Sequence, residues 1–399
     1  MRFFNKVIEK VKKIIGNKVK QFVFLGLHIF TITTTYPGYY NLFILFLPVL
    51  RIVKKGKCYS VHFLPLVWVY KFLRTIVRKI QNRYLAEKYK FKKLSSTIIV
   101  LGKYTKIDDS IEQIITRRRM RYSTANRVLS DYIKNIDPKQ LSCAAGNLRE
   151  YQLKLLDLGI EIISMIEEMG YQPILSGGTL LGAFRHGGFI PWDDDIDFNL
   201  LRQDYNEVIH KLQSEMIVLN TDNCVVWSDF LNLVDIKMKD YPNQVILVLT
   251  PSGAKFFKGT CLQDCAVVDL FAYDVISEKV QDEDYKLFWL KHNKSKYLQK
   301  GGTWKDLFDS LHELEQDRAL FDPDGDKFYY GIATHGFWMF KYQGLFPLDV
   351  WLPVKRMKFE NHEFFAPNKP EEWLRRQYGE NYNKIPLYIQ ESIHLNERK

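Results

Sequence analysis

Residues 190–198 read Ile-Pro-Trp-Asp-Asp-Asp-Ile-Asp-Phe, and a group of carboxylates at this spacing can bind a hard metal ion. Alternate side chains of a strand share one face, so we expect Asp193, Asp195 and Asp197 on one side and Asp194, with the apolar neighbours, on the other. Converging carboxylates repel one another and raise one another's pKa unless a cation lies among them. Such oxygen ligands favour Mg²⁺ or Mn²⁺ over zinc.

A glycine-rich segment stands directly before these acids. Gly177 and Gly178 leave backbone amides sterically open to a phosphate, and Thr179 is expected to cap the helix that follows. Arg185 and His186 add positive charge. An acidic surface turn or a Ca²⁺ loop would leave the two glycines and the arginine unexplained. A divalent ion beside a phosphate cradle is the equipment for phosphoryl transfer, because the ion neutralises phosphate oxygens and positions an incoming hydroxyl.

The surrounding pattern alternates helices and strands. Apolar spacing predicts a helix over 148–170, a short strand over 171–175, a short helix after Thr179, a strand over 190–200 and a helix over 204–212. These elements would place the two glycines at the start of one helix and the aspartates on a neighbouring strand.

Residues 177–197 resemble the hallmark Gly-Gly-[Thr/Ser]-Leu-Leu-Gly-Ala-x-Arg-His-x-Gly-x-Ile-Pro-Trp-Asp-Asp-Asp-Ile-Asp of the LicD/fukutin family. The segment 268–271 with Asp274, and the tail over 359–386, are similar to two further family segments, so the resemblance covers about 148–390. It implies an α/β (α+β) fold, with a nucleotidyltransferase-like mixed sheet and flanking helices.

The resemblance also implies roles for single residues. Asp195 and Asp197 match the paired carboxylates that bind the catalytic metal, with Asp193 beside them, and Asp269 matches a third carboxylate that ligates metal or accepts the proton of the attacking hydroxyl. Gly178, Arg185 and Trp192 match positions that contact a cytidine-diphosphate donor. We therefore predict a site whose catalytic residues are Asp195, Asp197 and Asp269, whose metal ligands are Asp193, Asp195 and Asp197, and whose donor-binding residues are Gly177, Gly178, Thr179, Arg185, His186 and Trp192.

By this resemblance the chain is a Mg²⁺- or Mn²⁺-dependent transferase that moves a phosphorylated group from a CDP-activated donor to a hydroxyl of a cell-surface glycan. Phosphocholine from CDP-choline is the first expectation, and ribitol or glycerol phosphate is the next. One alternative enzyme is a true nucleotidyltransferase that attacks the α-phosphate of an NTP. A non-enzymatic alternative is an adaptor for membranes or nucleic acid with a vestigial site, although the chain has no recognisable nucleic-acid-binding motif.

The first hundred residues carry a different signal. They hold 20 Lys or Arg against two acids, although the whole chain has a net charge of +11, so a basic region is joined to a mildly acidic body. Apolar runs over 46–55 and 63–71 predict a hairpin, whereas 68–93 has the spacing of a basic amphipathic helix. Such a region suits the anionic inner face of the plasma membrane. The uncharged stretch 21–50 is long enough to span a bilayer, but Pro37-Gly38 would break a single helix.

These signals predict three parts. They are a basic, aromatic-rich accessory or membrane-associating region over 1–100, a charged connector over 101–145 and a catalytic domain over 146–399. The five cysteines are odd in number and scattered, which fits a reducing, cytoplasmic compartment better than a disulfide framework.

Overall fold

The computed structural model describes the chain over 21–24, 27–36, 39–44, 47–55, 58–63, 66–117, 120–220, 227–250, 252–292, 313–314, 317, 319–332 and 341–389, with side chains from residue 74 on except 220–230. Contacts divide the chain into two compact units, Met1–Lys90 and Phe91–Lys399. The functional boundaries at residues 100 and 145 stay predictions.

The first unit contains an antiparallel sheet in the order β1-β2-β3-β4-β5. Its strands are β1 (Gln21–Phe24), β2 (Leu27–Tyr36), β3 (Tyr39–Ile44), β4 (Leu47–Lys55) and β5 (Cys58–Phe63). Lys55 pairs with Cys58, so a hairpin with the first predicted strand is confirmed, but its second strand is Cys58–Phe63 and not the predicted 63–71. The uncharged stretch 21–50 forms strands in its described parts rather than one long helix.

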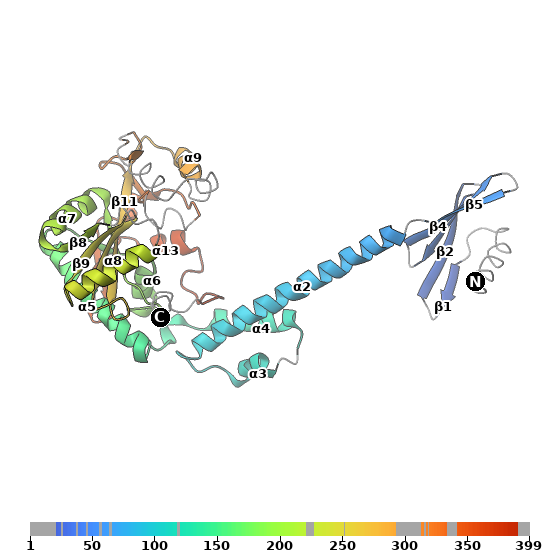
Figure 1. The fold of residues 1–399 in the computed structure, drawn as a ribbon, viewed down its shortest axis with the longest axis horizontal. Helices are drawn as coiled ribbons and strands as arrows, with labels where there is room; N and C mark the ends of the chain where they lie inside the picture. The colour runs from blue at the N-terminus through green and yellow to red at the C-terminus, as the bar shows by residue number, and fades with distance from the viewer. Residues whose placement is uncertain are drawn as a thin grey trace. The chain divides into compact units, whose positions relative to one another are not determined.

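A long helix, α2 (Leu66–Leu101), follows the small sheet (Figure 1). The prediction of a strand over residues 66–71 is therefore wrong, and the helical spacing of 68–93 is confirmed. The helix prevails because the apolar residues from Val69 to Ile80 recur at intervals of three and four. Within the part of the chain that the structure describes, no helix is both long enough and apolar enough to cross a membrane.

The second unit is built on a sheet of mixed direction, which confirms the predicted α/β class. The strand order is β14-β15-β6-β7-β11-β10-β9-β8, with β12 and β13 continuing from β11. Its strands are β6 (Ile174–Leu175), β7 (Asp197–Leu201), β8 (Ile217–Asn220), β9 (Ile246–Thr250), β10 (Gly253–Lys258), β11 (Ala266–Ile276), β12 (Lys327–Tyr330), β13 (Phe346–Pro347), β14 (Lys355–Phe359) and β15 (His362–Ala366). The parallel neighbours β7 and β11 lie at the middle of this order.

Helices cover both faces of the larger sheet. Phe256 packs with the core on the side of α5 (Gly146–Glu168), whereas its neighbour Phe257 packs with Val234 and Met238 of α8 (Trp227–Asp240). Successive side chains of a strand point to opposite faces, so α5 and α8 lie on opposite sides of the sheet (Figure 1). The other helices of this unit include α6 (Gly177–His186), α7 (Arg202–Glu215), α9 (Asp282–His292) and α13 (Pro370–Tyr378).

The predicted connector packs into the core of the second unit. Buried apolar residues come from the end of α2, from α3 (Asp109–Arg117) and from α4 (Tyr122–Asn135). The hydroxyl of Thr97, which is fully buried, donates to the carbonyl of Leu387 at 3.0 Å and accepts from the amide of Ile389 at 3.1 Å. The end of α2 is thus hydrogen-bonded to the C-terminal tail.

An ion pair joins α5 to the turn between β14 and β15. Arg149 donates to both carboxylate oxygens of Glu360 at 2.9 and 2.7 Å, and the amide of Phe189 donates to Glu360 at 3.1 Å. Burial alone would raise the pKa of Glu360, but these hydrogen bonds and the charge of Arg149 lower it. The pair therefore ties the segment before the aspartates to two distant elements.

Replacing Glu360 by Gln is expected to lower the free energy of unfolding by about 1.5 kcal/mol at neutral pH, since a hydrogen-bonded charge is lost. The folded pKa lies below the unfolded one, so this stabilisation is present above the unfolded pKa and is lost as the pH falls through the folded pKa. Urea unfolding at several pH values measures it. Glu167→Gln, which breaks the more exposed pair with Arg356, is the control, and equal effects of the two changes would contradict the prediction.

Candidate active site

The glycine turn and the aspartates meet where β6, α6 and β7 come together. Strand β6 ends at Leu175, α6 begins at Gly177, and Gly177 has a left-handed φ of +50° that glycine adopts freely. The amide of Ser176 donates to the carbonyl of Asp197 at 3.0 Å, which fixes the turn against β7. The first amides of α6 have no partner within the helix, so they are available to an anion.

The predicted strand over 190–200 is wrong for its first half. Strand β7 begins only at Asp197, because Pro191 lacks an amide hydrogen and the amide of Asp193 closes a turn onto the carbonyl of Ile190 at 2.9 Å. The alternation survives in the loop: Asp194 is only 5% exposed and Ile196 is fully buried, whereas Asp193, Asp195 and Asp197 are each half-buried.

Three carboxylates gather beside the glycines. A Cβ atom on Gly178 would lie 2.8 Å from an oxygen of Asp193 and 4.0 Å from one of Asp195, and a Cβ on Gly177 would lie 3.3 Å from an oxygen of Asp197. A side chain at either glycine would therefore press on these acids. The carboxylates fit beside the turn because neither glycine has a side chain.

The acids repel one another. Burial, followed by the charges of Asp195 and Asp197, raises the pKa of Asp193 well above its ordinary value, and Asp193 is also hydrogen-bonded to Asp195. Burial and the charges of Asp195 and Asp269 raise the pKa of Asp197. A bound cation would remove this repulsion.

Asp269 joins the group from β11. It pairs in register with Asp197 on the parallel strand β7, so both side chains lie in one row on one face of the sheet. Its amide donates to the carbonyl of Ile196 at 3.1 Å. The structure thus brings together Asp193, Asp195, Asp197 and Asp269.

Thr179 has a different place from the one predicted. The residue before α6 is Ser176, so Thr179 lies inside the first turn and is not its cap. Thr179 is 2% exposed, and its hydroxyl accepts from the amide of Asp197 at 2.9 Å. Thr179 therefore positions the aspartate strand from inside the protein.

The buried Arg185 and the half-buried His186 end α6 as a pair. The Nε of Arg185 donates to His186 at 2.9 Å, and Arg185 also donates to the carbonyls of Tyr382 and Lys384 at 3.4 and 3.1 Å. Burial lowers the pKa of Arg185 to about 10, against the opposing charges of Tyr378 and Asp193, and burial with the charge of Arg185 lowers the pKa of His186 to about 3. Arg185 therefore stays positive at neutral pH and His186 stays neutral.

Trp192 is 8% exposed and lies against Tyr104, with ring centroids 6.0 Å apart. In this conformation the indole belongs to the core. Among the predicted donor-binding residues, Gly177, Gly178 and Arg185 lie at the aspartates, whereas Trp192 supports the loop that carries them.

Residues 170–264 match the family model described as LicD/FKTN/FKRP, nucleotidyltransferase domain. The chain carries a LicD-family domain. An alignment 266 positions long covers 60% of the chain and 92% of the lipopolysaccharide cholinephosphotransferase LicD of Haemophilus influenzae, at 26% identity. A stretch of 43 residues, 11% of the chain, is 44% identical to the ribitol 5-phosphate transferase FKRP of mouse and of human, and covers 9% of each.

Three residues near the acids escaped sequence reasoning. Gln152 of α5 is fully buried and donates to the carbonyl of Asp193 at 2.9 Å, which holds the aspartate loop. Lys255 pairs with Asp269. Tyr378 ends α13 and is 38% exposed as a whole residue, but burial of its hydroxyl, followed by the charges of Asp193, Asp197 and Asp195, raises the pKa of that hydroxyl. Of the three, only Tyr378 has a local sequence signal, since Gly379 after it predicts the end of a helix.

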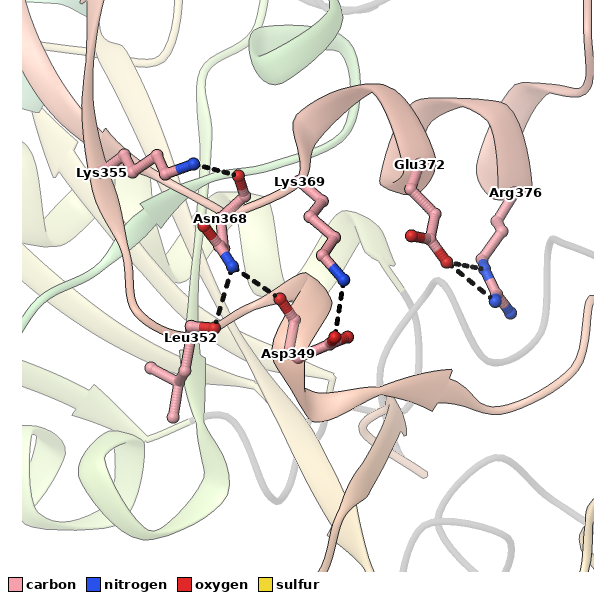
Figure 2. A network of polar contacts seen from close by, with 7 residues as sticks. All are labelled: Asp349, Leu352, Lys355, Asn368, Lys369, Glu372 and Arg376. Carbon is pink, nitrogen blue, oxygen red and sulfur yellow. Dashed lines mark hydrogen bonds and ion pairs between the residues drawn. The ribbon is translucent and has the colours of Figure 1, made fainter.

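A polar network fixes the start of α13 and so the place of Tyr378 (Figure 2). Lys369 pairs with Asp349 at 2.6 Å, and Asn368 donates to the carbonyls of Asp349 and Leu352 at 2.9 and 3.2 Å. Arg376 pairs with Glu372 on the same helix at 3.0 Å, and Figure 2 shows this pair as well.

Proposed function

We propose that this LicD-family protein transfers a phosphorylated group from a CDP-activated donor to a hydroxyl of a cell-surface glycan. The observation that carries the proposal is the group of four aspartates around the glycine turn, on strands β7 and β11 and the loop before β7. The similarity to a lipopolysaccharide cholinephosphotransferase over 92% of that protein supports a transferase of phosphate-containing groups, and phosphocholine as the group. The local similarity to FKRP makes ribitol phosphate the second candidate.

The proposal includes a divalent cation, Mg²⁺ or Mn²⁺. Among the described residues, no three His, Cys, Asp or Glu side chains are arranged so that they alone could hold a metal ion. Mg²⁺, however, is commonly bound by one or two carboxylates together with substrate phosphates and water. Asp195 and Asp197, with Asp193 beside them, fit this mode, because a cation bound among them would offset the repulsion between their negative charges. When bound, the ion neutralises the charge that develops on the phosphate oxygens.

The chain's own groups would bind and orient the substrates. The first amides of α6, at Gly177 and Gly178, would bind a phosphate, and Arg185 lies within electrostatic reach of Asp193, whose charge raises the pKa of the arginine. The hydroxyl of Tyr378 keeps its proton at neutral pH, so it can donate a hydrogen bond to a phosphate or sugar oxygen. These groups approach the carboxylates from two helices, α6 and α13.

Release of CMP tests the reaction. Purified protein is incubated with Mg²⁺ and a glycan extract, and with CDP-choline, CDP-ribitol, CDP-glycerol or CTP in separate reactions, and CMP and pyrophosphate are measured. We expect CMP from one donor, lost in Asp195→Asn and retained in Asp264→Asn, whose carboxylate lies exposed on the surface. Pyrophosphate from CTP, with no CMP from any donor, would instead establish nucleotidyl transfer.

We also propose that α2 binds the anionic face of a membrane. Ile76, Val77, Ile80 and Tyr84 recur at helical spacing and are 38%, 51%, 64% and 52% exposed. Residues 74–93 carry eight Lys or Arg and one acid. An apolar stripe on so basic a helix fits anionic lipids, whereas a second copy of the same helix would be repelled. The site would then work close to lipid-linked acceptors.

Replacing Ile80 by Ser is expected to lower binding to anionic phospholipid vesicles about tenfold, since a buried isoleucine contributes on the order of 1.5–3 kcal/mol. Cosedimentation with neutral and anionic vesicles measures this. Leu85→Ser is the matched control, because Leu85 is 57% exposed but lies off the stripe. Equal losses in the two variants, or equal binding to neutral vesicles, would refute attachment through this stripe.

A further inference from the structure

A lysine completes the row of charges across the sheet. Asp197 on β7 pairs in register with Asp269 on β11, and Asp269 pairs in register with Lys255 on β10. The three side chains therefore project from adjacent strands on one face, in the order acid, acid, base. Sequence spacing gives no sign of this row, because register between strands creates it.

The lysine contacts the middle acid closely. The Nζ of Lys255 lies 2.6 Å from each carboxylate oxygen of Asp269, and the two side chains are 17% and 18% exposed. Contact with both oxygens fixes the plane of the carboxylate as well as its position. The influence reaches the next strand, where Lys255 lowers the pKa of Asp197 against the larger opposing effects of burial, Asp195 and Asp269.

A second pair on the same strand provides a comparison. Lys258 lies 2.6 Å from Glu161 of α5, with side chains 36% and 40% exposed. Positions 255 and 258 are three apart, so they face opposite sides of the sheet. The pair of Lys258 joins a strand to a helix, whereas the pair of Lys255 stands within the acidic group.

We propose that Lys255 is a positioning residue of the active site, which holds the carboxylate of Asp269 beside Asp197 and acts as a permanent counter-cation that limits how tightly the aspartates bind a divalent ion. The proposal rests on the proposed function. Its consequence is a balance: the site binds its metal loosely enough for the ion to be shared with the phosphates of the donor.

Lys255→Met tests this balance through direct metal binding and through turnover. Mn²⁺ titration followed by electron paramagnetic resonance is expected to show about tenfold tighter binding, because the charge of Asp269 is no longer compensated. Turnover, measured as CMP release, is expected to fall at least tenfold. Lys258→Met should change neither quantity, and Lys255→Met combined with Asp269→Asn should return Mn²⁺ affinity close to that of the unaltered protein.

The outcomes separate the two proposals. Unchanged or weaker Mn²⁺ binding in folded Lys255→Met, beside normal CMP release in the unaltered protein, would overturn the role of Lys255 alone. Tighter Mn²⁺ binding without CMP release from any donor would retain that role and refute the reaction. If Lys255→Met does not fold, Lys255→Arg replaces it: unchanged Mn²⁺ affinity with reduced turnover supports positioning, and unchanged turnover contradicts it.

Discussion

Replacing Asp197 by Asn is expected to lower turnover about a thousandfold while leaving the metal-free protein at least as stable as before. The carboxylate lies at the start of β7, beside the glycine turn and in register with Asp269, so its loss removes charge from the centre of the site. Removing one preorganised electrostatic contact of this kind commonly costs 10²–10³ in rate. The amide side chain keeps the shape, so Thr179 and Ser176 retain their bonds to the backbone of residue 197.

The stability of the metal-free protein should not fall with turnover in Asp197→Asn, and it should rise at neutral pH. Burial and neighbouring carboxylates raise the folded pKa of Asp197 above its unfolded value, so the ionised group destabilises the fold. This cost is fully present above the folded pKa and disappears as the pH falls below the unfolded pKa, where both states are protonated. Asparagine carries no charge and removes the cost at neutral pH.

Thermal unfolding with and without EDTA, at neutral and acidic pH, measures both effects beside the CMP assay. The unaltered protein should gain stability from Mg²⁺, and Asp197→Asn should gain little. Asp264→Asn, an exposed change, should behave like the unaltered protein. A folded Asp197→Asn variant with near-normal turnover would remove Asp197 from the mechanism, and a marked loss of stability would show that its charge is needed by the fold.

Gly182→Ala is expected to destabilise the second unit by about 2–3 kcal/mol, which lowers the melting temperature by several degrees. A Cβ on Gly182 would lie 2.5 Å from the carbonyl oxygen of Gly188 and 3.1 Å from the amide nitrogen of Ile190. Both atoms belong to the backbone, so no rotamer relieves the clash. The steric cost exceeds the gain of about 1 kcal/mol that alanine brings to a helix. Turnover should fall as well, because the displaced segment leads to Asp193.

The control is a helical glycine with a softer neighbour. A Cβ on Gly159 of α5 would lie 3.2 Å from the terminal methyl of Ile196, which can move. Gly159→Ala should therefore change stability by less than about 1 kcal/mol. Denaturant unfolding of the two variants measures the difference in their free energies of unfolding. Equal stability of both would mean that α6 and the 188–190 segment can separate without cost.

The sequence predicts the helices and strands around the site better than the side chains within it. The helix over 148–170 corresponds to α5 and the one over 204–212 lies within α7, because their apolar periodicity is strong. The strand over 190–200 is half wrong, since alternation of burial at Asp194 and Ile196 persists in a loop. The alternation of apolar and polar residues indicates which side chains are buried, whereas backbone hydrogen bonds determine whether the segment is a strand.

Contacts between residues far apart in the sequence limit how much of the site the sequence predicts. Lys255 reaches Asp269 through pairing of β10 with β11, and Gln152 reaches Asp193 from a helix 41 positions earlier. Thr179 follows the glycines in the sequence, yet its partner is the amide of Asp197. Each contact depends on the packing of whole elements, which spacing in one chain does not contain.

The hydrogen bonds of Thr97 decide which fragment suits study of the catalytic part alone. Thr97 binds Leu387 and Ile389, and Arg185 binds the carbonyls of Tyr382 and Lys384 in the same tail. A shortened protein that starts after Thr97 would lose these bonds together with the fully buried Leu94, and one that stops before Ile389 would lose the bond from the amide of Ile389. Expression from a point ahead of Phe91 through Ile389 keeps both ends joined.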